Sequence, residues 1–149
     1  MPNCRTHSQV GAVAGGLFSL SHARSEVPPN RILEVFGGVM GGIVGGRLPD
    51  IVEPATSPRH RSTAHSWLVL FIVAAVSLEA ARRQCREQAR SCEQRLSSLW
   101  LSPEQRVLFA LLSVLWRISS GFCTGVQVGY VSHLVLDGCT PSGLPIFVR

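Results

Sequence analysis

Three glycine pairs at four-residue intervals place the strongest constraint on what this chain can fold into. They stand at positions 37/38, 41/42 and 45/46, within a stretch, 31–46, that is otherwise rich in large apolar residues. Glycine costs up to about 1 kcal/mol per residue in a water-exposed helix. Six of them therefore indicate a helix whose backbone packs closely on another, as in small-xxx-small contacts between membrane helices. A flexible linker is the alternative, but the intervening apolar residues argue against it.

The low charge content favours a membrane-associated chain. Hydrophobic residues make up 46% of the sequence and charged residues 15%, against the roughly 25% charged residues of a soluble domain. No segment is an uninterrupted span of about 20 apolar residues, although Ile118–Leu136 comes near. At 149 residues, the chain is expected to form one helical, membrane-associated domain, 1–149.

Apolar periodicity and end signals predict an all-α, up-and-down bundle of about four helices. Pro28 and Pro29 separate the first two, with Asn30 as N-cap of the second. Ser102-Pro103-Glu104-Gln105 predicts an N-cap, a first-turn proline and a capping box for the fourth, which is expected to bend at Gly121 or Gly125. The predicted helices cover about 7–23, 31–46, 66–99 and 103–137.

The third and fourth predicted helices are longer than the first pair, so they protrude as a charged hairpin tip, 79–106. A packing seam is expected at Cys85, Ala89, Cys92, Leu96 and Leu99. The arginines of 82–95 alternate with glutamates and indicate a solvated helix face rather than a nucleic-acid site. Five cysteines with no CxxC pair argue against a disulfide framework and a thiolate zinc site.

Alternating helix directions bring histidines and aspartates from distant segments to one end of this bundle. The first helix starts at that end, the second returns to it, and the irregular loop 47–66 lies there. The fourth helix, which extends about 45 Å from Pro103 to His133 at 1.5 Å per residue, ends there too. Each residue alone fits a cap or a turn, but together they predict a divalent metal site. The predicted ligands are His7, Asp50, His60, His65, His133 and Asp137.

This ligand chemistry limits which metal is expected. Neutral imidazoles and carboxylates suit zinc, manganese or iron. Four histidines and two aspartates exceed what one tetrahedral zinc ion uses, so the number of ions, one or two, stays open. Carboxylates in an apolar setting are costly unless cations neutralise them.

Three strings of residues follow an early Thr6-His7 in the order Leu48-Pro49-Asp50-Ile51, His60-Arg61-x-x-x-His65-Ser66 and His133-x-x-x-Asp137-x-x-Thr140-x-x-Gly143. In this order and spacing they resemble the motifs of the YdjM-like family of bacterial inner-membrane proteins, described as metal-dependent hydrolases. The resemblance covers 6–146. It implies an α-helical membrane protein with a metal site built from the six predicted ligands. Val52, Glu53, Ser62 and Ala64 depart from the family's motifs.

The expected function is that of a membrane-bound metal-dependent hydrolase in which metal-activated water attacks a phosphoester or a lipid-like ester. Glu53 would act as general base, and Arg61 or Arg59 would bind an anionic oxygen. The main alternative is a non-enzymatic membrane protein in which a metal or polar cluster fastens one end of the bundle. A soluble bundle that binds a partner through 82–99 is the third.

Location and partners complete these expectations. The five arginines of 82–95 place that segment in the cytoplasm by the positive-inside rule, with the metal end on the opposite side of the inner membrane. The expected partners are the membrane and a small-molecule or lipid-like substrate, with no nucleic acid. Self-association is expected through the glycine-rich helix 31–46.

Overall fold

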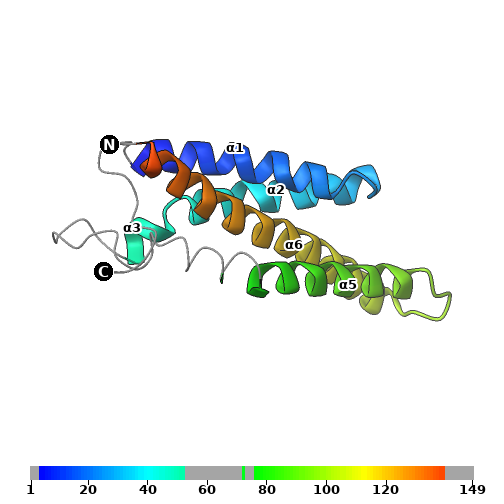
Figure 1. The fold of residues 1–149 in the computed structure, drawn as a ribbon. Helices are drawn as coiled ribbons and strands as arrows, with labels where there is room; N and C mark the ends of the chain where they lie inside the picture. Colours follow the sequence, from blue (N-terminus) through cyan, green and yellow to red (C-terminus); the bar gives the residue numbers. More distant parts are fainter. Residues whose placement is uncertain (1–3, 53–71, 73–75, 140–149) are drawn as a thin grey trace.

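A computed structural model describes residues 4–52, 72 and 76–139 of the chain, and all of its elements are helices (Figure 1). No strand occurs among those residues. The predicted all-α fold is therefore confirmed. The helices are α1 (Cys4–His22), α2 (Pro28–Gly45), α3 (Leu48–Val52), α5 (Leu78–Leu96) and α6 (Pro103–Gly138).

The long helices alternate in direction, as the sequence predicts. Gly15 of α1 approaches Gly125 of α6, whereas His7, two turns earlier on α1, lies beside Asp137, three turns later on α6. α1 and α6 are therefore antiparallel. α5 and α6 form the expected hairpin, whose turn reaches beyond the α1–α2 end of the bundle (Figure 1).

The glycine pairs of α2 allow two neighbouring helices to pack closely against it. The first glycine of each pair, at 37, 41 and 45, faces the backbone of α6, and the second, at 38 and 42, faces α1. Added Cβ atoms at 37, 41, 42 and 45 would meet backbone atoms, and one at 38 would meet the Ser19 side chain and the Gly15 carbonyl oxygen. The close packing predicted from the glycines thus occurs within the chain, on both sides of α2. Self-association through this helix stays a prediction.

Several helix ends differ from the predicted ones. α2 begins at Pro28 and contains both prolines, because proline has no N–H to donate and its fixed φ suits the first turn. Asn30 is consequently not an N-cap; its side-chain amide donates to Glu93 of α5 instead. α6 runs as one helix through Gly121 and Gly125, so neither glycine interrupts it, and the capping box at Ser102 and Gln105 is confirmed.

Two sequence predictions about the third helix are wrong in part. Leu99 does not join the packing seam: α5 ends at Leu96 and Leu99 is 87% exposed, whereas Ala89 and Cys92 are buried. The arginines of 82–95 do not all form a solvated face, because Arg82 is buried and Arg86 pairs with Glu34 of α2. The part of this helix predicted before residue 76, apart from Ile72, lies outside the described residues.

Buried ion pairs join α5 to the rest of the bundle at the end away from α3. The guanidinium of Arg117, which is 1% exposed, donates to Glu93 through two nitrogens at 2.9 and 3.0 Å. Its third nitrogen lies 2.9 Å from both Glu34 and Glu26. Arg90 also pairs with Glu26, at 2.8 Å. Burial alone would raise the pKa of Glu26, but the hydrogen bond from Arg90 and the charge of Arg117 hold it below its usual range.

The surface carries many large apolar side chains on α1, α2 and α6. Among the described residues, two stretches are long and apolar enough to cross a membrane, Pro28–Ile51 and Pro103–Gly138. α5, by contrast, exposes a polar face that includes Arg83, Glu87 and Gln94. The exposed apolar side chains of the first two helices include Val13, Leu17, Phe18, Leu20, Ile32, Phe36, Met40 and Val44.

Candidate metal centre

Four of the six predicted ligands meet at one end of the bundle. His7 lies in the first turn of α1, Asp50 in the short helix α3, and His133 and Asp137 one turn apart near the end of α6. The two histidines are 2% and 0% exposed and Asp137 is 4% exposed. The Asp50 side chain, at 35%, is the most accessible of the four. The group can therefore be approached from the side of Asp50.

The ligand atoms lie at the separations of a coordination sphere. Nε2 of His133 is 3.5 Å from Asp137 and 3.7 Å from Asp50, and Nε2 of His7 is 3.6 Å from Asp137. These distances exceed the roughly 2.7–3.2 Å of an N–H···O hydrogen bond. They match the edge of about 3.4 Å between two ligands of a tetrahedral zinc ion with bonds of about 2.1 Å.

A backbone carbonyl sets the tautomer of His133. Nδ1 of its ring lies 2.8 Å from the carbonyl oxygen of Gly46, which can only accept, so Nδ1 carries the proton and donates it there. In a neutral imidazole the lone pair then belongs to Nε2, the atom that points to both aspartates. This is the usual arrangement of a metal-binding histidine, whose second nitrogen is fixed by an acceptor.

The two histidine rings stack on each other. The rings of His7 and His133 are 3.8 Å apart at their centroids and inclined by 21°. The stacking brings the Nε2 atoms of both rings to the same carboxylate, that of Asp137. Gly46 supports it sterically, because a Cβ there would lie 2.5 Å from the carbonyl oxygen of His7.

The residues present therefore fit a divalent ion. His7, Asp50 and His133 each offer one ligand atom, and these atoms lie within 4.8 Å of one another. Asp137 contacts both histidines and can complete a fourth position or orient them. Two nitrogens and one or two carboxylate oxygens suit zinc, manganese or iron.

The other predicted site residues lie outside the described part of the chain. They are His60 and His65 among the ligands, and Glu53, Arg59 and Arg61 among the residues with a chemical role. Their predicted roles remain predictions, and so does the presence of a second ion.

Sequence reasoning missed two features that shape the site and the bundle. The Gly46 carbonyl carries no sequence signal, because any residue supplies one. Glu34 and Arg117 could have been found: each is the one charged residue within a long apolar stretch, 32–46 and 107–136 respectively. Such isolated charges in apolar helices require partners, and here they pair with each other.

Comparison with known proteins adds a family match. A family model described as YdjM inner membrane protein matches residues 1–148. Neither a curated protein nor a solved structure matches the chain. The family match covers all four residues that meet at the end of the bundle.

Proposed function

We propose that this chain, which belongs to the YdjM family of inner membrane proteins, binds a divalent metal ion through His7, Asp50, His133 and Asp137 and hydrolyses an ester or phosphoester. The observation that carries the proposal is the geometry of His133. Its Nδ1 donates a hydrogen bond to the carbonyl oxygen of Gly46, and its Nε2 lies 3.5–3.7 Å from two carboxylates. That separation suits two ligands of one ion better than a hydrogen bond.

The chain's own residues would bind and orient the reacting groups. A divalent ion bound here would lower the pKa of a water molecule and so supply a nucleophile at neutral pH. Asp137 contacts both imidazoles and holds them toward the same point. Asp50 lies on the accessible side, where a substrate would arrive. Glu53 would take the proton of the attacking water, and Arg61 would bind an anionic oxygen of the substrate. His60 and His65 would complete the ligand set.

The depth of burial favours a second candidate, a structural metal centre. Three of the four residues are at most 4% exposed, and closed, buried sites are typical of structural metals. In that case the ion would fasten α1, α3 and α6 together and catalyse nothing. The half-exposed Asp50 supports the catalytic alternative, because a catalytic site keeps one position open.

Hydrolysis assays on the reconstituted protein distinguish the two candidates. The wild type would be loaded with zinc or manganese and offered generic phosphoesters and carboxylic esters, with His65→Ala and His133→Ala for comparison. Metal-dependent turnover that both variants lose supports the hydrolase. Metal-dependent thermal stabilisation of the wild type without turnover supports the structural centre. Neither turnover nor stabilisation contradicts both.

The proposed orientation places the metal centre away from the cytoplasm. The arginine-rich segment 82–95 lies toward the opposite end of the bundle from α3 (Figure 1), and positive segments are retained in the cytoplasm. A thiol-reactive, membrane-impermeant reagent applied to intact cells tests this. We expect it to label an Asp50→Cys variant and to leave Arg90→Cys unlabelled until the cells are opened, in a background without the native cysteines. The reverse pattern contradicts the orientation.

A further inference from the structure

Two cysteines from different helices meet where α5 packs against α6. Cys85 lies on α5 and Cys123 on α6, and their thiols are close enough to interact with each other. Both side chains are partly buried, and both are free thiols. Ten residues, or about 15 Å along α6, separate Cys123 from His133. The pair is therefore distinct from the metal centre.

The register of the α5–α6 hairpin independently places these two cysteines at the same level. Arg117 of α6 donates to Glu93 of α5 at 2.9 and 3.0 Å, which fixes one level of this antiparallel pair. From that level, Cys85 is eight residues back along α5, and Cys123 is six residues further along α6. At 1.5 Å per residue, these steps are about 12 Å and about 9 Å in the same direction. The pairing of the helices itself therefore brings the two cysteines together.

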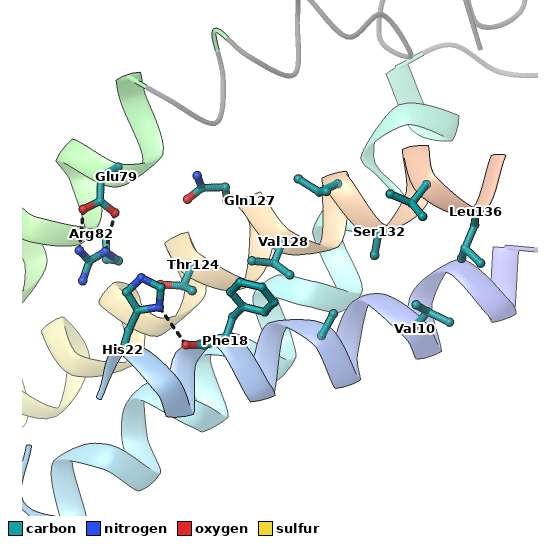
Figure 2. A pocket seen from close by; sticks show the side chains of 13 residues that line it. Val10, Phe18, His22, Glu79, Arg82, Thr124, Gln127, Val128, Ser132 and Leu136 are labelled. Carbon is teal, nitrogen blue, oxygen red and sulfur yellow. Dashed lines mark hydrogen bonds and ion pairs between the residues drawn. The ribbon is translucent and has the colours of Figure 1, made fainter. Parts of the chain in front are cut away.

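The neighbours of Cys85 keep the two helices close and in register. Ala89, one turn after Cys85 on the same face of α5, is completely buried, and so small a side chain permits a short distance between helix axes. One turn before Cys85, Arg82 donates to Glu79 at 2.6 and 2.7 Å. This ion pair and Thr124, the residue after Cys123, line the same end of a pocket between α1 and α6 (Figure 2).

We propose that Cys85 and Cys123 form an intramolecular disulfide when the protein meets a low-molecular-weight disulfide as oxidant, and that this bond fastens α5 to α6. The thiolate of one cysteine attacks a sulfur of the oxidant, whose S–S bond breaks and releases the first thiol. The thiolate of the other cysteine then attacks the protein sulfur of the mixed disulfide, and the second thiol leaves. The two cysteines lose two electrons and two protons, and the oxidant gains both as it becomes two thiols.

The surroundings of Cys85 favour a disulfide over a thiolate metal site. Burial raises the pKa of the Cys85 thiol above its usual range, so at neutral pH the side chain is a neutral thiol. A metal ion would require a thiolate there. A disulfide carries no charge and therefore suits the partly buried interface of two helices.

The folded structure promotes the second step of the exchange. Because the helices hold the two cysteines together, that step is intramolecular and its effective concentration is high. The bond then closes the chain between residues 85 and 123 into a loop, which restricts the unfolded state and so stabilises the fold. This inference holds whether or not the chain binds metal.

Peptide mapping after oxidation tests the proposal. In a variant whose exposed Cys4 and Cys139 are replaced by serine, the remaining cysteines are Cys85, Cys92 and Cys123. The purified protein in detergent would be treated with oxidised glutathione, unfolded, alkylated and digested without reduction. We expect mass spectrometry to find a peptide pair joined through Cys85 and Cys123, with Cys92 alkylated. A pair joined through Cys92, three alkylated cysteines, or separate glutathione adducts without a joined pair would overturn the proposal.

Thermal unfolding supplies a second measurement, in which each variant is compared with its own reduced form. Oxidation should raise the melting temperature of the three-cysteine protein. It should do the same for Cys92→Ser, the matched control, because Cys92 lies on the same helix but outside the pair. Cys85→Ser and Cys123→Ser should show no such rise. An unchanged or lowered melting temperature of the cross-linked protein would contradict a bond that fits the native packing, and so would a rise in either of these two variants.

Discussion

The imidazole rings of His7 and His133 stack 3.8 Å apart, although one lies in the first turn of α1 and the other near the end of α6. The contact brings the two ends of the described chain together beside Asp137. The metal site therefore depends on the antiparallel packing of α1 and α6. Substitutions that alter this packing should change the affinity for the metal.

Removing one ligand should weaken metal binding without unfolding the bundle. We expect His7→Ala to reduce the affinity for zinc by at least ten-fold, since even changes around a ligand cost about 10–100-fold. His22→Ala is the matched control, because His22 is an exposed histidine at the other end of the same helix. Isothermal titration calorimetry in detergent measures both. Equal affinities for the two variants would exclude His7 as a ligand.

Gly46 should be needed for metal binding although it supplies no side chain. In Gly46→Ala, the new Cβ would lie 2.5 Å from the His7 carbonyl oxygen, so the start of α1 must shift away from His133. We expect a loss of zinc affinity of about ten-fold or more. Gly16→Ala, whose Cβ meets only the Val39 side chain at 3.0 Å, should bind zinc normally. A reversed order of affinities would contradict the role given to this close approach.

The glycine pairs show how far the sequence alone determines this fold. Their spacing predicts a closely packed helix, and their recurrence along an apolar stretch makes that prediction specific. The sequence does not tell which helix each glycine meets. That depends on the rotation of α2 between α1 and α6, which distant residues such as Gly11 and Phe122 decide.

The candidate site was predictable to the extent that it depends on helix direction. Because the helices alternate in direction, the sequence predicts that four residues converge at one end of the bundle: His7, Asp50, His133 and Asp137. The hydrogen bond from His133 to Gly46 and the stacking on His7 depend on side-chain rotation, which the spacing of residues does not reveal. The sequence pattern likewise predicted a solvated face that includes Arg82 and Arg86. It could not show that Arg86 pairs with Glu34, because Glu34 lies on another helix.

Neutralising Glu34 should destabilise the bundle. In Glu34→Gln, the buried Arg117 and the adjacent Arg86 lose a charged partner. Removing one partner of a buried ion pair costs about 3–5 kcal/mol, so a clear fall in melting temperature is expected. Glu87→Gln, on the exposed face of α5, should change stability by less than about 0.5 kcal/mol. Thermal unfolding followed by circular dichroism compares them, and similar melting temperatures would refute the role of the ion pairs.

The start of α5 should be sensitive to acid. Hydrogen bonds from Arg82, and then from Arg83, lower the pKa of Glu79 from 4.5 to about 2, against the opposing effect of burial. A carboxyl group with a depressed pKa stabilises the fold above its unfolded pKa and loses this contribution as the pH falls from about 4.5 toward 2. Unfolding measured from about pH 6 to pH 3 should show a smaller loss of stability in Glu79→Gln than in the wild type. Parallel curves would contradict the assignment.

Elemental mass spectrometry of the purified protein tests the shared metal site most directly. Wild type and His133→Ala would be prepared in the same detergent, exposed to zinc and freed of excess ion by gel filtration. We predict at least one zinc ion per wild-type chain and less than about a tenth of that in the variant, because His133 Nε2 is the atom nearest to both aspartates. Wild-type protein without metal, or a variant with undiminished zinc, would contradict the account.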